Sequence, residues 1–462
     1  MVVKTTKEAY KLLHYGNLAL SRVEANGVRI DVDYLNSAIS ESSKQVKEIE
    51  ERLKSAKEWS VWTERFGTKA SLGSRQQLGK VLFDVLGHTY PRPVPASKRY
   101  TVDEDILMDV GTDFTKLYLK LAKLEKASGT YLKGILAHVT PDGLLHGTFS
   151  LTTTKTYRSS AYDPNLQNIP IRDPEIGRLV RTAFIPRPGH CIIEVDFKGA
   201  EVCVGACYHQ DARMLRYIRE GYDMHIGSAI HCFRLRQDEV TKEIRQHAKG
   251  SFTFAEFYGD WYKSIAKSLW ASIERYDIKT KDGKSLYEHL RNRGIGTLGP
   301  CENKRDPLPG TFERQIQEAE HWLWKEEFTG YDQWRKDWYN EFLEKGYFHT
   351  LTGFTIHGPL SRNDVCNYPV QGSAFHCLLW CLITLMMEIE RQGKQTKVFG
   401  QIHDSVVADV PENEAKWYCD TMTEIITDRL PSHWKWVITP MVAEVEAAPV
   451  GASWFDKCPI VV

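Results

Sequence analysis

The sequence predicts an α+β fold in which long helical stretches flank a region of short β-strands. Helical periodicity covers most of residues 34–138 and returns after residue 212, whereas residues 143–207 contain short apolar, β-branched runs. Two such runs end in an aspartate, in CIIEVDFKGAE and in VFGQIHDSVVADV. With 462 residues, 42% of them hydrophobic, the chain is large enough to bury a core divided into roughly two to four subdomains.

The first third of the chain is predicted to be mostly helical. Residues 1–33 form a short lead-in, and residues 34–56 have the charged periodicity of a helix. Prolines at positions 91, 93 and 95 predict a loop, because proline lacks the amide donor that a helix needs. Helices are expected to resume over residues 103–138.

The remaining sequence alternates between strand and helix patterns. Strands are expected at residues 145–151 and 190–195, and helices at 214–272, 312–345 and 374–389. The stretch 278–310 is polar and punctuated by glycine and proline, so we expect a surface elaboration there.

The two strand-end aspartates, Asp196 and Asp404, are candidates for binding a hard divalent cation. Two carboxylates from distant strands can hold a pair of Mg²⁺ ions about 3.5–4 Å apart, which stabilises the attacking and leaving oxygens of phosphoryl transfer. The alternative is that each aspartate only forms a turn or caps a helix.

A basic helix lies between these aspartates in the sequence. Arg245 and Lys249 are four residues apart, so both cations project from one helix face, and the aromatic residues Phe254, Phe257 and Tyr258 follow. Such a helix offers charge for phosphates and a flat ring for a base. The alternative is a solvated basic turn that leads into an aromatic core segment.

Together these segments resemble the family A DNA polymerases, the group of bacterial polymerase I and phage replicases. The three motifs occur in the family's order: Asp196-Phe-Lys-Gly-Ala-Glu201, the Arg-x-x-x-Lys helix that ends in Tyr258-Gly259, and His403-Asp404. Further similar segments are Tyr157 to Pro170, Asn367-Tyr-Pro-Val-Gln371-Gly and the opening stretch from Asn26 to Asp31. The resemblance therefore extends over nearly the whole chain.

The resemblance implies a right-hand polymerase architecture with palm, fingers and thumb. The implied division is a lead-in that belongs to the palm (1–33), the thumb (34–139), the first part of the palm (140–211), the fingers with an insertion at about 278–310 (212–363), and the second part of the palm (364–462).

The implied activity is template-directed extension of a DNA primer with dNTPs, using two Mg²⁺ ions for which Mn²⁺ can substitute. The metal ligands would be Asp196, Asp404 and the backbone carbonyl of Phe197. His225, Arg245 and Lys249 would contact the triphosphate, with Lys249 also donating a proton to the departing pyrophosphate.

The same resemblance assigns sugar and DNA contacts. Glu201 would exclude a ribose 2′-hydroxyl, and Tyr258 would line the nucleotide site. Arg158, Asn367 and Gln371 would contact the minor groove of the primer–template, where all correct pairs present similar acceptors, and His403 would lie on the DNA side.

Charge must be segregated if this chain binds DNA, because 60 Lys and Arg residues balance 60 Asp and Glu residues. One basic stripe is visible: Lys116, Lys120 and Lys123 recur at helical spacing opposite leucines at 117, 121 and 124. In the resembling family this region is the thumb, so the stripe is predicted to contact phosphates. The alternative is an ordinary solvated helix face.

Two positions depart from the family pattern. Tyr258 lies nine positions after Lys249, whereas the spacing in the family is usually eight. The residue that stacks on the nucleotide is therefore either Thr253 or Phe254. We favour Phe254, because a π-bulge after Lys249 would absorb the extra residue. Ser405 replaces the glutamate that normally follows the second aspartate, which predicts weaker metal binding or a bridging water.

The remaining patterns bear on location, partners and alternatives. The chain has ten cysteines without a C-x-x-C pair, no secretory segment and no apolar run of membrane length, which predicts a soluble protein of a reducing compartment. We expect it in the cytoplasm of a bacterial or phage-infected cell. We also expect a monomer, with any processivity factors on separate chains. Nothing before Asn26 resembles a proofreading exonuclease, so a complete chain is expected to extend primers without editing. The alternatives are a single-subunit RNA polymerase, opposed by Glu201, and a DNA-binding accessory protein with a weakened site, suggested by Ser405.

Overall fold

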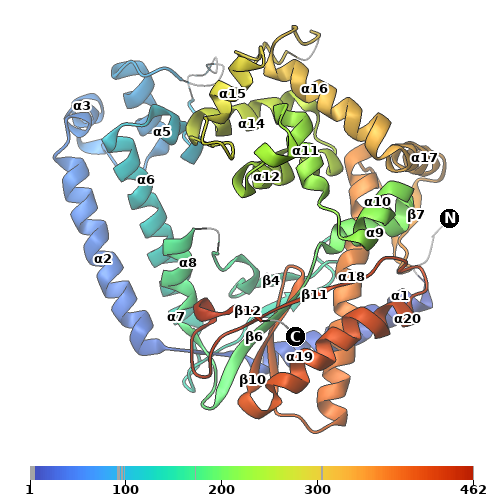
Figure 1. Ribbon diagram of the computed structural model, residues 1–462. Coiled ribbons are helices and arrows are strands. Elements are labelled where there is room, and N and C mark those ends of the chain that lie inside the picture. The colour runs from blue at the N-terminus through green and yellow to red at the C-terminus, as the bar shows by residue number, and fades with distance from the viewer. Residues whose placement is uncertain are drawn as a thin grey trace.

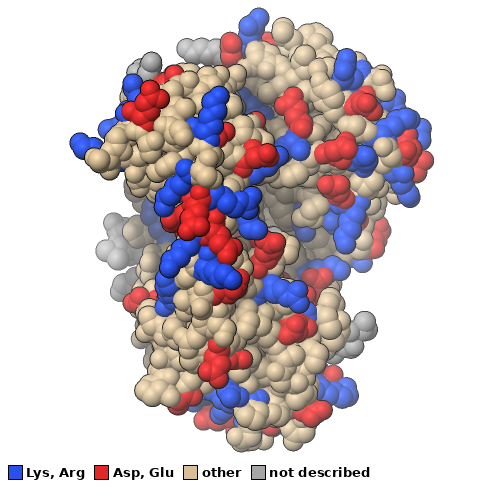
Figure 2. All heavy atoms as spheres, turned by 90° about the vertical axis from the view of Figure 1, so that its left-hand side faces the viewer, with Lys and Arg blue, Asp and Glu red and all other residues tan. Residues whose placement is uncertain are grey.

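The computed structural model describes residues 6–90, 94, 97, 99–171, 173–302 and 305–460. A β-sheet backed by helices forms the base, and two helical arms extend from it on opposite sides (Figure 1). The space-filling view from the thumb side is hollowed between the upper and lower parts of the molecule (Figure 2). This is the predicted α+β, right-hand arrangement: the sheet is the palm, the N-terminal arm is the thumb and the other arm is the fingers.

The palm is built on a five-stranded antiparallel sheet in the order β12-β11-β6-β10-β9. Its strands are β6 (His190–Phe197), β9 (Lys397–Ile402), β10 (Ser405–Pro411), β11 (Ala443–Ala447) and β12 (Cys458–Ile460). Branched apolar residues such as Ile193, Val195 and Val406 are completely or almost completely buried, so the central strands are pinned by the core. β6, which contains Asp196, pairs directly with β10, which begins just after Asp404, and this pairing fixes how the two aspartates lie.

Helices and minor strands complete the palm. The predicted lead-in is largely a helix, α1 (Lys7–Asn26), which packs on β9 and α18. The other palm elements are α8 (Pro174–Arg181), α9 (Ala200–His209), α19 (Ala415–Glu424), α20 (Leu430–His433), and the short strands β1 (Val28–Ile30), β2 (Leu144–Leu145), β3 (Thr148–Ser150), β4 (Ser160–Tyr162) and β5 (Phe184–Ile185). The hairpin of β7 (Tyr347–His349) and β8 (Thr355–His357) falls within the range predicted for the fingers.

The thumb is an all-helical arm with its own core. It contains α2 (Val32–Lys54), α3 (Lys57–Phe66), α4 (Arg75–Lys80), α5 (Glu104–Val110), α6 (Asp113–Lys126) and α7 (Gly134–His138). Asp31 caps α2 by accepting a hydrogen bond from the amide of Tyr34, which explains the helix start two residues before the predicted one. Pro91, Pro93 and Pro95, which predicted a loop, lie outside the described residues.

The fingers consist of consecutive helices, and the helical stretch predicted over 214–272 is divided among several of them. They are α10 (Ala212–Glu220), α11 (Met224–Phe233), α12 (Lys242–Ala248), a π-helical turn (Lys249–Thr253), α13 (Phe254–Phe257), α14 (Tyr262–Arg275), α15 (Leu286–Asn292), α16 (Phe312–Trp322) and α17 (Thr329–Lys345). Breaks occur at Gly221, which has a left-handed backbone, and at the side-chain caps Asp223 and Thr241.

The insertion at 278–310 is not a mere surface elaboration, and that expectation was wrong. Ile278, Leu290 and Ile295 are almost completely buried in the fingers core. The buried Lys263 donates to the backbone carbonyls of Glu302 and Arg305 and lies 3.8 Å from Glu313. Polar composition concealed this role, because the buried apolar residues are widely spaced among glycines and charges.

Helix α18 (Arg362–Arg391) is nearly twice as long as predicted, because it continues through Pro369. Proline removes the amide that would bond to the carbonyl four residues earlier. That carbonyl, of Val365, accepts a hydrogen bond from the indole of Trp338 at 3.0 Å. The expectation of no apolar run of membrane length was also wrong, since α18 has the length and composition to span a bilayer, but 72% of its most apolar window is buried inside the protein.

The tips of thumb and fingers are joined by one arginine. Arg275, the last residue of α14, donates to Asp105 at 2.7 Å and to Asp109 at 2.8 Å, both on thumb helix α5. Its side chain is only 16% exposed. This contact, near the top of Figure 1, restrains the thumb tip against the fingers.

Replacing Arg275 with alanine should loosen the thumb tip. Such ion pairs contribute roughly 1 kcal/mol, so amides of Glu104–Val110 should exchange hydrogen about fivefold faster, as measured by mass spectrometry. Arg236→Ala is the control, because among the described residues Arg236 pairs with Asp238 and Glu239, both on its own arm. Unchanged exchange in α5 would show that the contact does not hold the thumb.

Candidate active site

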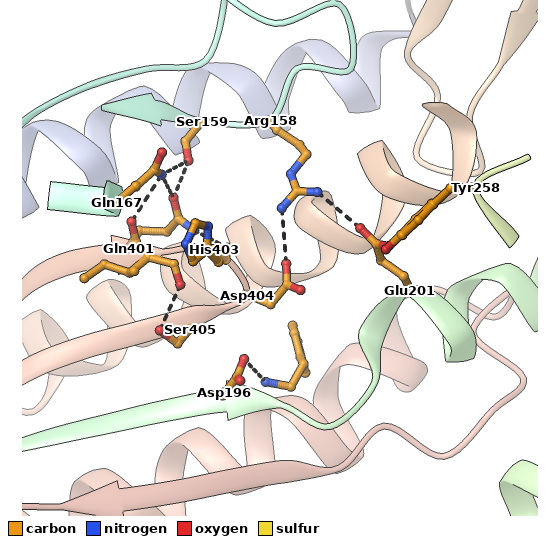
Figure 3. Close-up of polar contacts among 12 residues, drawn as sticks. Arg158, Ser159, Gln167, Asp196, Glu201, Tyr258, Gln401, His403, Asp404 and Ser405 are labelled. Carbon is orange, nitrogen blue, oxygen red and sulfur yellow. Dashed lines mark hydrogen bonds and ion pairs between the residues drawn. The ribbon is translucent and has the colours of Figure 1, made fainter. Parts of the chain in front are cut away.

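The two strand-end aspartates come together at one end of the palm sheet. In the β6–β10 pairing, Asp196 lies opposite Ser405, the residue after Asp404. The backbone amide of Phe197 donates to both aspartates: to a carboxylate oxygen of Asp196 at 2.8 Å and to the backbone carbonyl of Asp404 at 3.3 Å. Figure 3 shows both aspartate side chains in the same small region.

The carboxylates of this pair repel each other. Burial, followed by the neighbouring carboxylates of Asp404, Glu194 and Glu444, raises the pKa of Asp196 to about 7. A divalent cation would relieve that repulsion. Among the described residues, no group of three or more His, Cys, Asp or Glu side chains is placed to hold a metal ion. Two carboxylates suit Mg²⁺, whose other ligands are commonly waters and substrate phosphates.

A buried polar network supports the turn that carries Asp404. His403 and Asp404 form the two-residue connection between β9 and β10, and His403 has a positive φ of 53°. The fully buried Gln401 donates to the His403 carbonyl at 2.6 Å. The side-chain oxygen of Gln401, Oε1, accepts hydrogen bonds from Ser159 and from Gln167 (Figure 3). These contacts stabilise the positive-φ backbone conformation of His403, which is otherwise unfavourable.

Arg158 links Glu201 to Asp404 in the candidate site. Its guanidinium lies 3.2 Å from Glu201 and 3.6 Å from Asp404. Glu201 also accepts a hydrogen bond from the hydroxyl of Tyr258 at 2.6 Å, so the three side chains form one chain of contacts (Figure 3). Burial and this carboxylate raise the pKa of Tyr258, which keeps its hydroxyl protonated as a donor.

The predicted phosphate ligands lie together on the fingers. Arg245 forms an ion pair with Asp223. Burial, with smaller contributions from Lys249 and Arg245, lowers the pKa of His225 to about 4, so the ring is neutral at pH 7. Lys249 has no anionic partner among the residues that the structure describes, and its ammonium lies 5.5 Å from the Phe254 ring centre.

The prediction of a π-bulge after Lys249 is confirmed. Residues Lys249–Thr253 form a π-helical turn, which accommodates one extra residue. Thr253 is therefore fully buried and donates to Ser228 at 2.8 Å. Phe254 instead is only partly buried and contacts His225 and Tyr258, with ring centres 5.6 and 6.2 Å away. Of the two candidates, Phe254 is the one beside the phosphate ligands.

The predicted DNA contacts are distributed over several elements. Asn367 on α18 donates to the Tyr258 carbonyl at 2.8 Å, and Gln371 lies one turn further along, lining the same cavity as Tyr258. His403 is exposed at its turn. On the thumb, Lys116 and Lys120 are exposed, whereas Lys123 forms ion pairs with two carboxylates, Glu104 at 2.9 Å and Asp173 at 3.2 Å.

The sequence interpretation missed several supporting residues. Glu194 accepts hydrogen bonds from Ser405 at 3.0 Å and from Trp454 at 2.9 Å. Burial would raise the pKa of Glu194, but the ion pair with Lys457 and these hydrogen bonds bring it below its usual value. Glu194 and Gln401 shared one detectable signal: each is a polar residue inside an otherwise apolar strand.

A sheet that carries paired aspartates between two helical arms defines the right-hand fold of nucleic-acid polymerases. Comparison with known proteins gives the same result. The model of DNA polymerase family A matches residues 37–293, more than half of the chain. The chain therefore belongs to DNA polymerase family A.

Several relatives and one solved structure are similar over most of this chain. DNA polymerase I of Geobacillus stearothermophilus is 27% identical over 435 residues, covering 89% of this chain and 43% of the relative. That of Bacillus subtilis (strain 168) is 26% identical over 454 residues, covering 95% and 44%. The chain thus spans less than half the length of these relatives. The POL domain of Pol1 from M. smegmatis, solved in complex with DNA primer-template and dNTP, has the same fold, with a TM-score of 0.74, 24% identity and coverage of 96% of this chain and 70% of that chain.

Removing the Asp196 charge should stabilise the metal-free protein at neutral pH. Because the folded pKa exceeds the unfolded value of 3.8, the unfolded chain loses its proton first, and stability falls as pH rises from about 4 to 7. Asp196→Asn should raise the free energy of unfolding by up to roughly 4 kcal/mol at pH 8, at 1.36 kcal/mol per pKa unit, and by less at pH 5. Urea denaturation at both pH values measures this.

The exposed Asp420 on α19, which pairs with Lys416, provides the matched control Asp420→Asn. Its effect should stay within about 1 kcal/mol at both pH values. A destabilised Asp196→Asn variant, or a gain that is the same at pH 5 and pH 8, would contradict the proposed repulsion.

Proposed function

We propose that this chain is a template-directed DNA polymerase that adds dNTPs to the 3′ end of a primer by nucleotidyl transfer. The observation that carries the proposal is the convergence of Asp196 and Asp404 beside a Glu201–Tyr258 pair and an unpaired Lys249. We retain the division into lead-in (1–33), thumb (34–139), palm (140–211 and 364–462) and fingers (212–363) as part of this proposal.

Asp196, Asp404 and the carbonyl of Phe197 would hold two Mg²⁺ ions, with Mn²⁺ as a substitute. When bound, these ions would lower the pKa of the primer hydroxyl and balance charge on the triphosphate. Both carboxylates must be ionised for this role. A bound cation would offset the repulsion between Asp196 and Asp404 and favour the ionised form of Asp196. Cation binding and deprotonation of Asp196 are therefore coupled.

The fingers would bind the triphosphate and base of the incoming nucleotide. Lys249 can meet a phosphate without breaking an existing ion pair, whereas Arg245 must share its charge with Asp223. The neutral imidazole of His225 can donate one hydrogen bond to a phosphate oxygen. An ammonium held against phosphate oxygens is also a suitable proton donor to pyrophosphate. The Phe254 ring would stack on the base or sugar.

Glu201 would select deoxyribose. Its carboxylate is held by Arg158 and Tyr258, so it cannot easily move aside for a 2′-hydroxyl. A hydroxyl packed there would lose solvation and meet a fixed obstacle.

Primer–template DNA would lie between the arms. The related Pol1 POL domain was solved with DNA primer-template and dNTP, which supports the same partners for this chain. Arg158, Asn367, Gln371 and His403 would meet the duplex end. On the thumb, the exposed Lys116 and Lys120 could contact phosphates directly. Lys123 would first have to give up its ion pairs with Glu104 and Asp173.

Asp196→Asn and Asp404→Asn should each slow primer extension about a thousandfold, equivalent to roughly 4 kcal/mol of lost transition-state stabilisation. Single-turnover incorporation with Mg²⁺ measures the effect, and fluorescence anisotropy should show nearly unchanged binding of primer–template. Asp420→Asn serves as the control. Near-normal incorporation by either active-site variant would exclude the proposed metal site.

Glu201→Ala should admit ribonucleotides at least tenfold more readily relative to deoxyribonucleotides, because the obstacle beside the sugar is removed. Competition between dNTP and rNTP in primer extension measures the ratio, and Glu220→Ala, an exposed change at the end of α10, is the control. An unchanged ratio would refute the assigned role. Primer-independent synthesis from ribonucleotides by the unmodified protein would instead favour an RNA polymerase.

A further inference from the structure

A second carboxylate lies on the same face of β6 as Asp196. Glu194 precedes Asp196 by two residues, so both side chains leave the strand on one side. The register places Asp196 opposite Ser405 on β10 and opposite Glu444 on β11, and Glu194 opposite Val407 and Glu446. Glu194 is thus diagonal to Ser405, the position at which the family normally has a glutamate.

Three side chains hold the carboxylate of Glu194 in place. One carboxylate oxygen accepts from the Ser405 hydroxyl at 3.0 Å, and the other accepts from Trp454 at 2.9 Å and Lys457 at 2.5 Å. The side chain is only 13% exposed, so its orientation is fixed. Since Ser405 follows Asp404 directly, the hydrogen bond from Ser405 joins β6 to the end of the turn that carries the second metal aspartate.

We propose that Glu194 is a positioning residue of the metal site, supplying from β6 the carboxylate that this chain lacks at position 405. The proposal rests on the proposed function, in which Asp196 and Asp404 hold divalent cations. Glu194 is already saturated by three donors, so it would not bind the cation itself. It would fix Ser405, and with it the Asp404 turn, and would add negative charge beside Asp196.

Lys457 does not cancel this charge, because it is shared. Lys457 is 8% exposed and also pairs with Glu446 at 2.5 Å. Two carboxylates therefore share one ammonium, with the buried Arg181 guanidinium as a second cation near both of them. The same geometry supplies a control, since Glu446 has the same ion-pair partner but no contact with Ser405.

The test is Mn²⁺ binding to the free protein, followed by electron paramagnetic resonance, which requires no catalysis. Glu194→Gln should weaken Mn²⁺ binding about 10- to 100-fold, the usual cost of losing a partner of a metal ligand. Glu446→Gln should change affinity less than about twofold. Ser405→Ala, which keeps the Glu194–Lys457 ion pair, should also weaken binding, and it replaces Glu194→Gln if that variant unfolds. Thermal melting in the absence of metal identifies any unfolded variant.

An exchange variant provides the sharpest comparison. Glu194→Ser combined with Ser405→Glu moves the carboxylate to the neighbouring strand and should recover most of the affinity lost in Glu194→Ser alone. If Glu194→Gln, or Ser405→Ala in its place, binds Mn²⁺ like the unmodified protein while Asp404→Asn loses binding, this inference fails and the metal site stands. If Asp404→Asn also binds normally, or the unmodified protein binds no Mn²⁺, both the proposed metal site and the role of Glu194 are overturned.

Discussion

The pairing of β6 with β10 is the constraint on which the site depends. Seven consecutive residue pairs, from Ser405 with Asp196 to Pro411 with His190, fix the register. A slip by one residue would turn every side chain of one strand to the opposite face. If β6 slipped, buried Val195 would leave its side of the core while Asp196 entered it. The hydrophobic core therefore enforces the position of two carboxylates that repel each other.

Around this pairing, the polar groups of the candidate site form hydrogen bonds and ion pairs with one another. Arg158 bridges Glu201 and Asp404, Arg245 pairs with Asp223, and Asn367 binds the Tyr258 carbonyl. Nucleotide and DNA would replace such internal partners with external ones. Preorganisation of this kind limits the entropy lost on binding, although each replaced contact subtracts from the affinity gained.

The sequence was most informative where chemistry requires particular residues at particular spacings. The fold class, the convergence of the two aspartates and the choice of Phe254 over Thr253 followed from motifs and from one extra residue in a helix. Patterns failed where tertiary contacts override local rules. Helix α18 passes through Pro369 because Trp338 binds the freed carbonyl, and the insertion is buried through a few scattered apolar residues. Glu194 and Gln401 could not be assigned, because their partners lie on distant segments.

The most direct test of the central claim is anomalous diffraction from Mn²⁺ in crystals of the protein with primer–template and an incoming dNTP. The account predicts anomalous peaks within about 2.5 Å of carboxylate oxygens from both Asp196 and Asp404, with a phosphate oxygen of the nucleotide on the same ion. Mn²⁺ bound to neither aspartate, or to one of them without the nucleotide, would contradict it.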